Sequence, residues 1–285
     1  MLVEALRWLA PPLAAAAVAA LFDRRLGGAG GAAAAMPPPG LVRPGRRLAA
    51  GALLAGLFYL TLFAPLSLPA DAAMPVDLST VSPWQLFLMH ALLLAGLGAW
   101  LALAYGVRGS PAAPVPAPGP LTFLRLRARD VGVEIGVGLL VGLTIWAAAL
   151  SFAALLVAGL NAAGGGDLLP TEPPRLILLV AGQPVWLRLA ISVSAGLVEE
   201  LFFRGFLQPR LGIWLTTGLF VLAHAAYGAP LMFVTVAFLS LAYGWLARRR
   251  GSVWAAVAAH TLFDAVQLLV VLPAALRAME DAPFG

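Results

Sequence analysis

Eight stretches of this chain are apolar over about the length that a helix needs to cross a lipid bilayer. A spanning helix takes about 20 mostly apolar residues, and the pattern predicts an all-α integral membrane protein with about eight transmembrane helices. The expected helices are Leu6–Phe22, Leu48–Leu66, Trp84–Tyr105, Val131–Leu160, Val185–Leu207, Leu211–Tyr227, Leu231–Ala247 and Val253–Leu272.

The composition excludes several other classes of protein. The chain is 61% hydrophobic and only 11% charged, whereas soluble domains carry about 25% charged residues. It has no cysteine, which excludes disulfides, cysteine nucleophiles and cysteine-ligated zinc. The net charge of +5 does not indicate a nucleic-acid partner, because most arginines lie in short loops between apolar stretches, as membrane orientation requires.

The arginines also predict the topology. Most of the 18 basic residues, all arginine, lie in or beside the odd-numbered loops, whereas the even-numbered loops are mainly acidic. Positive loops stay in the cytoplasm, so we expect both termini outside and a location in a bacterial inner membrane.

The first stretch could instead be a signal peptide. Its start is not clearly basic, and Pro11 and Pro12 interrupt it, so we favour a retained helix.

Proline and glycine mark the linkers. Gly27–Pro44 and Pro111–Pro120 are expected to be non-helical, and Leu121–Arg129 is expected on the anionic inner membrane surface. Polar chemistry is concentrated in the C-terminal part. The expected division is residues 1–180 as N-terminal helices, 181–276 as a catalytic helix bundle and 277–285 as a short tail.

Five ionisable residues fall inside the last four predicted helices. Each would cost about 2.5–3.5 kcal/mol at the bilayer centre, so one shared hydrated cavity is more plausible than five separate burials. These residues are Glu199, Glu200, His224, His260 and Asp264. His90, in an otherwise apolar helix, is interpreted as a hydrogen-bonded packing residue.

The two adjacent glutamates are predicted to face different neighbours. Consecutive helix residues point about 100° apart. Glu200 and Arg204 are four apart, in the order that favours an ion pair, which leaves Glu199 to face the bundle. The alternative is that both carboxylates join Arg204 and Arg210 in a charge cluster at the inner leaflet.

A carboxylate with two histidines suits hydrolysis by an activated water. Glu199 would be the general base, His224 would position the water, and His260 would stabilise the oxyanion. Asp264, four residues after His260, could orient that histidine. The same four residues could instead ligate a metal such as Zn²⁺, although no His-Glu-x-x-His helix is present, so the metal question stays open.

Three motifs in order resemble those of one family. They are Glu199-Glu200-x-x-x-Arg204, Phe220-x-x-x-His224 and His260-x-x-x-Asp264. Together, over about Val185–Leu272, they are similar to the CAAX-protease and bacteriocin-processing (CPBP, also ABI) family of intramembrane endopeptidases.

The resemblance implies a water activated by Glu199 and His224. His260 and position 264 would stabilise the oxyanion. The site would open to the cytoplasm. Other members have Asn at the last position. A carboxylate donates only when protonated, so Asp264 favours an orienting or ligating role.

The resemblance leaves the substrate open. Some members act on prenylated CAAX proteins, and some resemble bacteriocin immunity proteins. Others look like myxosortase-like enzymes that cut a C-terminal anchor from surface proteins. We expect a membrane-anchored protein or peptide as substrate, and the composition favours the sorting branch. The alternatives are a non-catalytic scaffold or self-immunity protein and, ranked last, a proton-coupled transporter.

Overall fold

The computed structural model describes seven parts of the chain, and every regular element in them is a helix. The described residues are 2–26, 37–64, 82–106, 118–166, 169, 175–225 and 230–280. The predicted linkers lie mostly outside these ranges, as do the acidic residues of the even-numbered loops.

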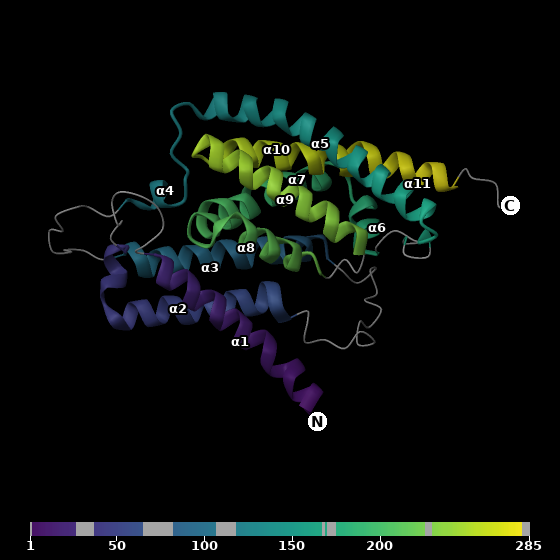
Figure 1. The fold of residues 1–285 in the computed structure, drawn as a ribbon. Coiled ribbons are helices and arrows are strands. Elements are labelled where there is room, and N and C mark those ends of the chain that lie inside the picture. Colours follow the sequence, from purple (N-terminus) through teal and green to yellow (C-terminus); the bar gives the residue numbers. More distant parts are fainter. Residues whose placement is uncertain are drawn as a thin grey trace.

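Figure 1 shows the helices in chain order. Two of them continue directly into π-helical segments, Tyr59–Phe63 and Glu200–Leu207, and a third π-helical segment, Gln267–Val271, joins the last two helices. The α-helices are α1 Leu2–Arg25, α2 Pro44–Phe58, α3 Leu88–Tyr105, α4 Pro120–Phe123, α5 Val131–Ala162, α6 Arg175–Ala181, α7 Val185–Glu199, α8 Gln208–Ala223, α9 Pro230–Arg250, α10 Trp254–Val266 and α11 Leu272–Glu280.

This architecture confirms the prediction of an all-α integral membrane protein. Each of the eight predicted stretches is helical where it is described. In the part of the chain that the structure describes, four helices are long and apolar enough to cross a membrane, by length and composition: Pro44–Phe63, Pro83–Tyr105, Val131–Ala162 and Trp254–Ala278. The count of eight spans stays a prediction, as does the division into three regions.

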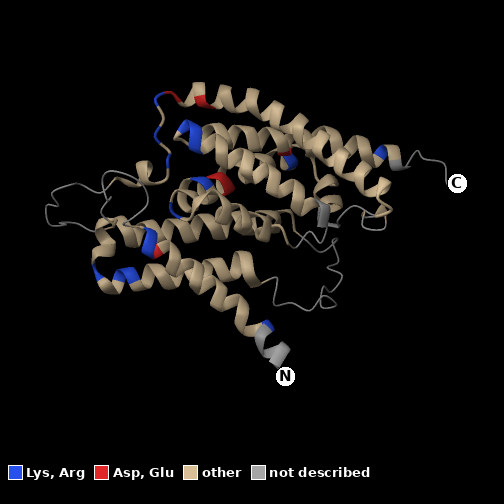
Figure 2. Cartoon of the chain, in the orientation of Figure 1, with Lys and Arg blue, Asp and Glu red and all other residues tan. Residues whose placement is uncertain are grey.

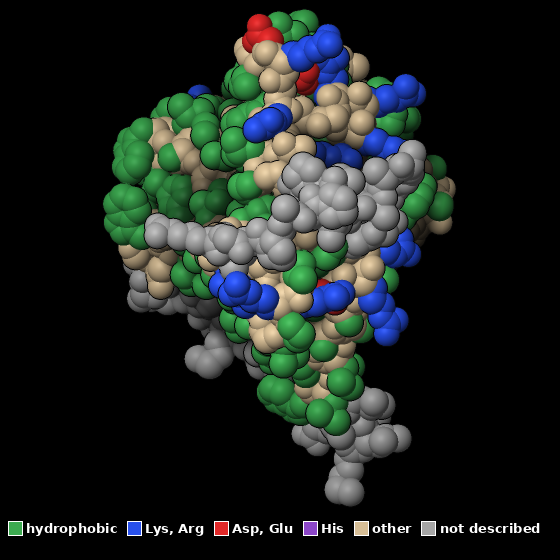
Figure 3. Space-filling view, turned by 90° about the vertical axis from the view of Figure 1, so that its left-hand side faces the viewer, with side chains coloured by type: hydrophobic (Ala, Val, Ile, Leu, Met, Phe, Trp, Pro, Cys, Tyr) green, Lys and Arg blue, Asp and Glu red, His purple; other side chains and the backbone are tan. Residues whose placement is uncertain are grey.

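The long helices run back and forth along one axis, so their connections lie at two ends of the bundle (Figure 1). Most arginines of the described residues lie at one end (Figure 2), and Figure 3 shows them gathered there. This end includes the last turns of α1, with Arg24 and Arg25, and of α9, with Arg248, Arg249 and Arg250. The bundle thus has one strongly basic end, as the loop pattern predicted.

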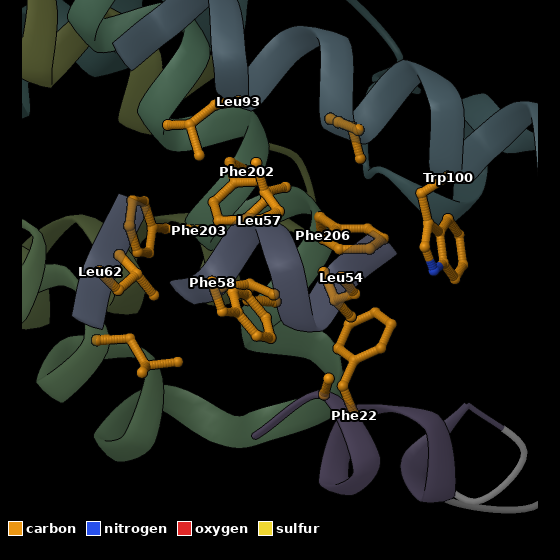
Figure 4. Packing of buried hydrophobic residues seen from close by; sticks show 14 of the residues in the cluster. Phe22, Leu54, Leu57, Phe58, Leu62, Leu93, Trp100, Phe202, Phe203 and Phe206 are labelled. Atoms are coloured by element: carbon orange, nitrogen blue, oxygen red, sulfur yellow. The ribbon is translucent and has the colours of Figure 1, made fainter. Parts of the chain in front are cut away.

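An aromatic core joins the N-terminal helices to the π-helical segment after α7 (Figure 4). The Phe206 ring lies 4.6 Å from that of Phe22 in α1 and 4.8 Å from that of Trp100 in α3. Phe202 and Phe203 are also almost completely buried. The N-terminal helices therefore support the segment that carries the first motif, and Phe202 and Phe203 are packing residues.

The segment predicted on the membrane surface is partly inserted between helices. Phe123 and Leu124 are buried, whereas Arg127 and Arg129 are exposed. Arg210 stacks over the Phe123 ring at 3.5 Å and donates to its carbonyl at 3.1 Å. The location of this segment on the inner membrane surface stays a prediction, and the structure adds that the aromatic side chain of its first half joins the core.

Glycine allows α5 to lie directly against α10. A Cβ atom on Gly142 would lie 2.7 Å from the Cα of Ala259, and one on Gly138 would meet the carbonyl of Ala255. Small residues four apart bring helix backbones together in membranes. Gly136, in the same helix, faces open space.

We expect Gly142→Ala to lower the free energy of unfolding by about 1–3 kcal/mol, because backbone must move to admit the methyl group. Gly136→Ala should leave it unchanged or raise it, since alanine favours the helix. Thermal unfolding of both variants in detergent checks this. Equal midpoints for the two variants would contradict the close packing.

Candidate active site

The first motif lies where α7 changes from an α-helix to a π-helix. Glu199 is the last α-helical residue and Glu200 begins the wider π-helical segment, a feature often found at functional sites. Glu199 faces His90 of α3, whereas Glu200 faces His260 of α10. The predicted divergence of the two side chains is present.

Glu200 forms a fully buried ion pair with Arg204. Its Oε2 lies 3.2 Å from Nε of Arg204, and neither side chain is exposed. Its Oε1 accepts a hydrogen bond of 3.0 Å from Nδ1 of His260. The predicted ion pair is confirmed. The alternative of a charge cluster at the inner leaflet is wrong for Glu200, because the pair lies inside the bundle and Arg210 contacts Phe123 instead.

Arg204 is held by helices α8 and α9. Its guanidinium lies 4.5 Å from the centre of the Phe220 ring, a favourable position for a buried cation. It also donates to Oγ of Ser240 at 3.3 Å, and that hydroxyl donates to Thr217. The motif residues Arg204 and Phe220 therefore contact each other directly.

Glu199 is the more accessible glutamate, with 16% of its side chain exposed. Its charge interacts with His90, His224 and His260, which are all the histidines of the chain. Asp264 interacts with the same three rings and with Glu199. The structure thus brings the four predicted site residues into one electrostatic cluster and adds His90 to them.

His224 lies directly after α8, and a hydrogen bond to the backbone decides which of its ring nitrogens carries the hydrogen. Nδ1 of the ring lies 2.8 Å from the carbonyl oxygen of Phe220. Because a carbonyl only accepts, Nδ1 carries the hydrogen. In the neutral ring the lone pair is then on Nε2.

His260 is oriented by Glu200, which sequence reasoning missed. A carboxylate accepts, so Nδ1 of His260 donates to Glu200. Nε2 lies 3.6 Å from Oδ2 of Asp264, beyond hydrogen-bond distance. The Tyr243 ring stacks on the imidazole at 5.0 Å between centres. Glu200 therefore orients His260 at Nδ1, and an orienting role of Asp264, which forms an ion-pair contact at Nε2, stays a prediction.

These donors do not fit a metal centre in the arrangement described. Among the described residues, no three His, Asp or Glu side chains are placed to hold one metal ion. We therefore derive no step through zinc.

His90, interpreted from the sequence as a hydrogen-bonded packing residue, is buried and hydrogen-bonded, and it also faces the cluster. Its Nε2 lies 3.5 Å from Oε1 of Glu199, and its Nδ1 lies 2.8 Å from Oγ of Ser194. The motifs gave no indication of it because it precedes them by several helices. The signal in the sequence was a histidine alone in an apolar helix, one of only three in the chain.

An apolar groove of about 550 Å³ lies between α3 and α7 beside this cluster. Ser194, the partner of His90, forms part of its wall. Its other lining residues are Leu94, Trp186, Leu189, Ala190, Val193, Leu197 and Val198.

Residues 181–266 match the family model described as type II CAAX prenyl endopeptidase Rce1-like. This match supports the assignment of the region to the CPBP family. The CPBP region extends from the end of α6 to the end of α10 and contains all three motifs, close to the predicted extent of Val185–Leu272. The N-terminal helices, with His90, lie outside it.

One relative of the chain is the uncharacterized protein YpbD of Bacillus subtilis (strain 168). It is 30% identical over 77 residues, which are 27% of this chain and 41% of that protein. The chain thus spans less than half of that relative's length. No solved structure matches the chain.

Proposed function

We propose that this protein is an intramembrane endopeptidase that hydrolyses a peptide bond of a membrane-associated protein or peptide. The observation that carries the proposal is the contrast between the two glutamates. Glu200 is buried and engaged by Arg204 and His260, whereas Glu199 is partly exposed, faces His90 and interacts electrostatically with His224 and His260. The CPBP match supports the reaction class.

In the proposed reaction Glu199 accepts a proton from water. The resulting hydroxide attacks the carbonyl carbon of the peptide and forms a tetrahedral intermediate. The intermediate then collapses, the C–N bond breaks, and the leaving amine takes the proton from Glu199. The first products are a carboxylic acid and an amine, one water is consumed, and the acid then passes its proton to the amine to give a carboxylate and an ammonium.

Two histidines would contact the two reacting oxygens, which are the water oxygen and the oxyanion of the substrate. His224 would position the water through Nε2. His260, when protonated, would donate from Nε2 to the oxyanion, since its Nδ1 is bound to Glu200 and Asp264 is not within hydrogen-bond distance of Nε2. One such donor contributes about 2.7–4 kcal/mol to the transition state. Asp264 would stabilise the imidazolium.

The proposed substrate approaches from the bilayer. The apolar groove beside the cluster is lined mainly by α7 and suits an apolar part of a membrane-anchored chain. Within this class we propose the C-terminal anchor of a surface protein as the target. The lipid bilayer is then a partner of both enzyme and substrate.

Incubation of the purified protein in liposomes with solubilised membrane proteins from a deletion strain tests the function. New protein termini should appear with the wild type and not with Glu199→Gln. A zinc chelator should leave their rate unchanged if hydrolysis is metal-free. Absence of new termini with the wild type would contradict the proposal, and loss of activity on chelation would contradict the metal-free mechanism.

We also propose that the basic end of the bundle is cytoplasmic, with both termini outside, in a bacterial inner membrane. Positive loops remain on that side. The chain has no cysteine, so single cysteines can report the topology. In intact spheroplasts a membrane-impermeant maleimide should label Trp84→Cys, at the opposite end, and spare Arg249→Cys. The reverse pattern would overturn the orientation.

A further inference from the structure

His90 links an N-terminal helix to the proposed base. It lies in α3, outside the region that matches the CPBP family, and only 9% of it is exposed. Burial of a polar ring is costly unless its nitrogens find partners. Both nitrogens face side chains of α7, namely Ser194 and Glu199.

These partners select one tautomer of the ring. The carboxylate of Glu199 lies 3.5 Å from Nε2 of His90 as an ion-pair contact and can only accept, so it favours a hydrogen on that nitrogen. In the neutral ring Nδ1 is then an acceptor, which the Ser194 hydroxyl satisfies by donating at 2.8 Å. In this tautomer the Ser194 hydroxyl faces an acceptor on His90, and the N–H group of His90 is on the side of the Glu199 carboxylate.

The contact also distinguishes the two oxygens of Glu199. Oε1 faces His90 at 3.5 Å. Oε2 has no hydrogen-bond partner among the described residues. With Oε1 directed toward α3, Oε2 is the buried oxygen without a partner, so it is the one that would accept from a water bound inside the bundle.

We propose that His90 is a positioning residue for the reaction, which holds Glu199 so that Oε2 meets the water. This inference rests on the proposed function, because it assigns the orientation of its general base. It also means that the site is incomplete without α3. The helices before the CPBP region would then contribute to chemistry as well as to packing.

His90→Phe should lower kcat by about 100-fold, since a misplaced catalytic group costs about that much, and should leave KM within a factor of about two because no substrate contact is lost. His90→Gln should restore most of the rate, because its amide nitrogen can donate from nearly the position of Nε2. The probe is a synthetic peptide that spans a cleavage site identified by terminus mapping. Ser194→Ala should give a smaller loss of kcat.

Leu93→Ala is the matched control. Leu93 is a buried residue of the same helix, so its truncation weakens packing without a change near Glu199. Per folded molecule this variant should keep the wild-type kcat. If it loses kcat as His90→Phe does, or if His90→Gln is no better than His90→Phe, the contact has only a packing role and the inference fails.

Glu199→Gln, measured in parallel, separates this inference from the proposed function. If Glu199→Gln is inactive and folded His90→Phe keeps the wild-type kcat, only the role of His90 is overturned. If Glu199→Gln keeps its activity, the proposed mechanism fails, whatever His90→Phe shows.

Discussion

Glu199→Gln is expected to lower kcat by about 10²–10⁴-fold, the usual contribution of a general base. The amide keeps the size of the side chain but cannot take a proton from water. Because Glu199 is not part of the buried ion pair, the variant should unfold at nearly the wild-type temperature. Cleavage rates of a mapped substrate peptide, normalised to folded protein, give the measurement.

The control for this experiment is Glu134→Gln. Glu134 is a buried carboxylate at the basic end of α5, where it pairs with Arg250 at 2.6 Å. Its replacement makes the same chemical change away from the cluster and should leave kcat unaltered. An equal loss of rate in both variants would mean that the assay reports folding, and a wild-type rate for Glu199→Gln would reject Glu199 as the base.

The buried ion pair should dominate stability. Arg204→Met leaves Glu200 without its cation inside the bundle, and breaking such a pair costs about 3–5 kcal/mol. We expect a clearly lower midpoint of thermal unfolding in detergent, and reduced activity because Glu200 also orients His260. Circular dichroism follows the unfolding of this all-helical protein.

Two further variants test whether the loss comes from an unpaired charge. The double variant Glu200→Gln with Arg204→Met removes both charges and should recover part of the midpoint lost by Arg204→Met alone. Arg250→Gln breaks a more exposed pair with Glu134 and should change the midpoint little. A double variant less stable than Arg204→Met would indicate that volume, not charge, decides stability there.

The helices could be predicted from the sequence because each is encoded locally. A run of apolar residues gives its position, and the bounds of α5, predicted as Val131–Leu160, differ by two residues at one end. Spacing within one helix was equally informative, since Glu200 and Arg204 are four apart and form the predicted pair. The three motifs gave the family for the same reason.

Contacts between distant helices could not be read in this way. His90 and Glu199 belong to helices that the chain order does not pair, and nothing in the apolar sequence around His90 indicates its partner. Nδ1 of His260 pairs with Glu200 and not with Asp264. This pairing depends on the wider π-helical turn after Glu199. Phe123 likewise joins the core through tertiary packing that overrides the amphipathic pattern of its segment.

We propose that the protein cleaves membrane-associated proteins in the cell and that Glu199 is required for this cleavage. A comparison of protein termini tests this proposal most directly. Membrane and surface proteins would be mapped in a deletion strain that carries either the wild type or Glu199→Ala at matched expression. The account predicts a defined set of proteins that keep uncut tails only with Glu199→Ala. Identical maps, with a phenotype still caused by the deletion, would contradict it and favour a non-catalytic scaffold or immunity protein.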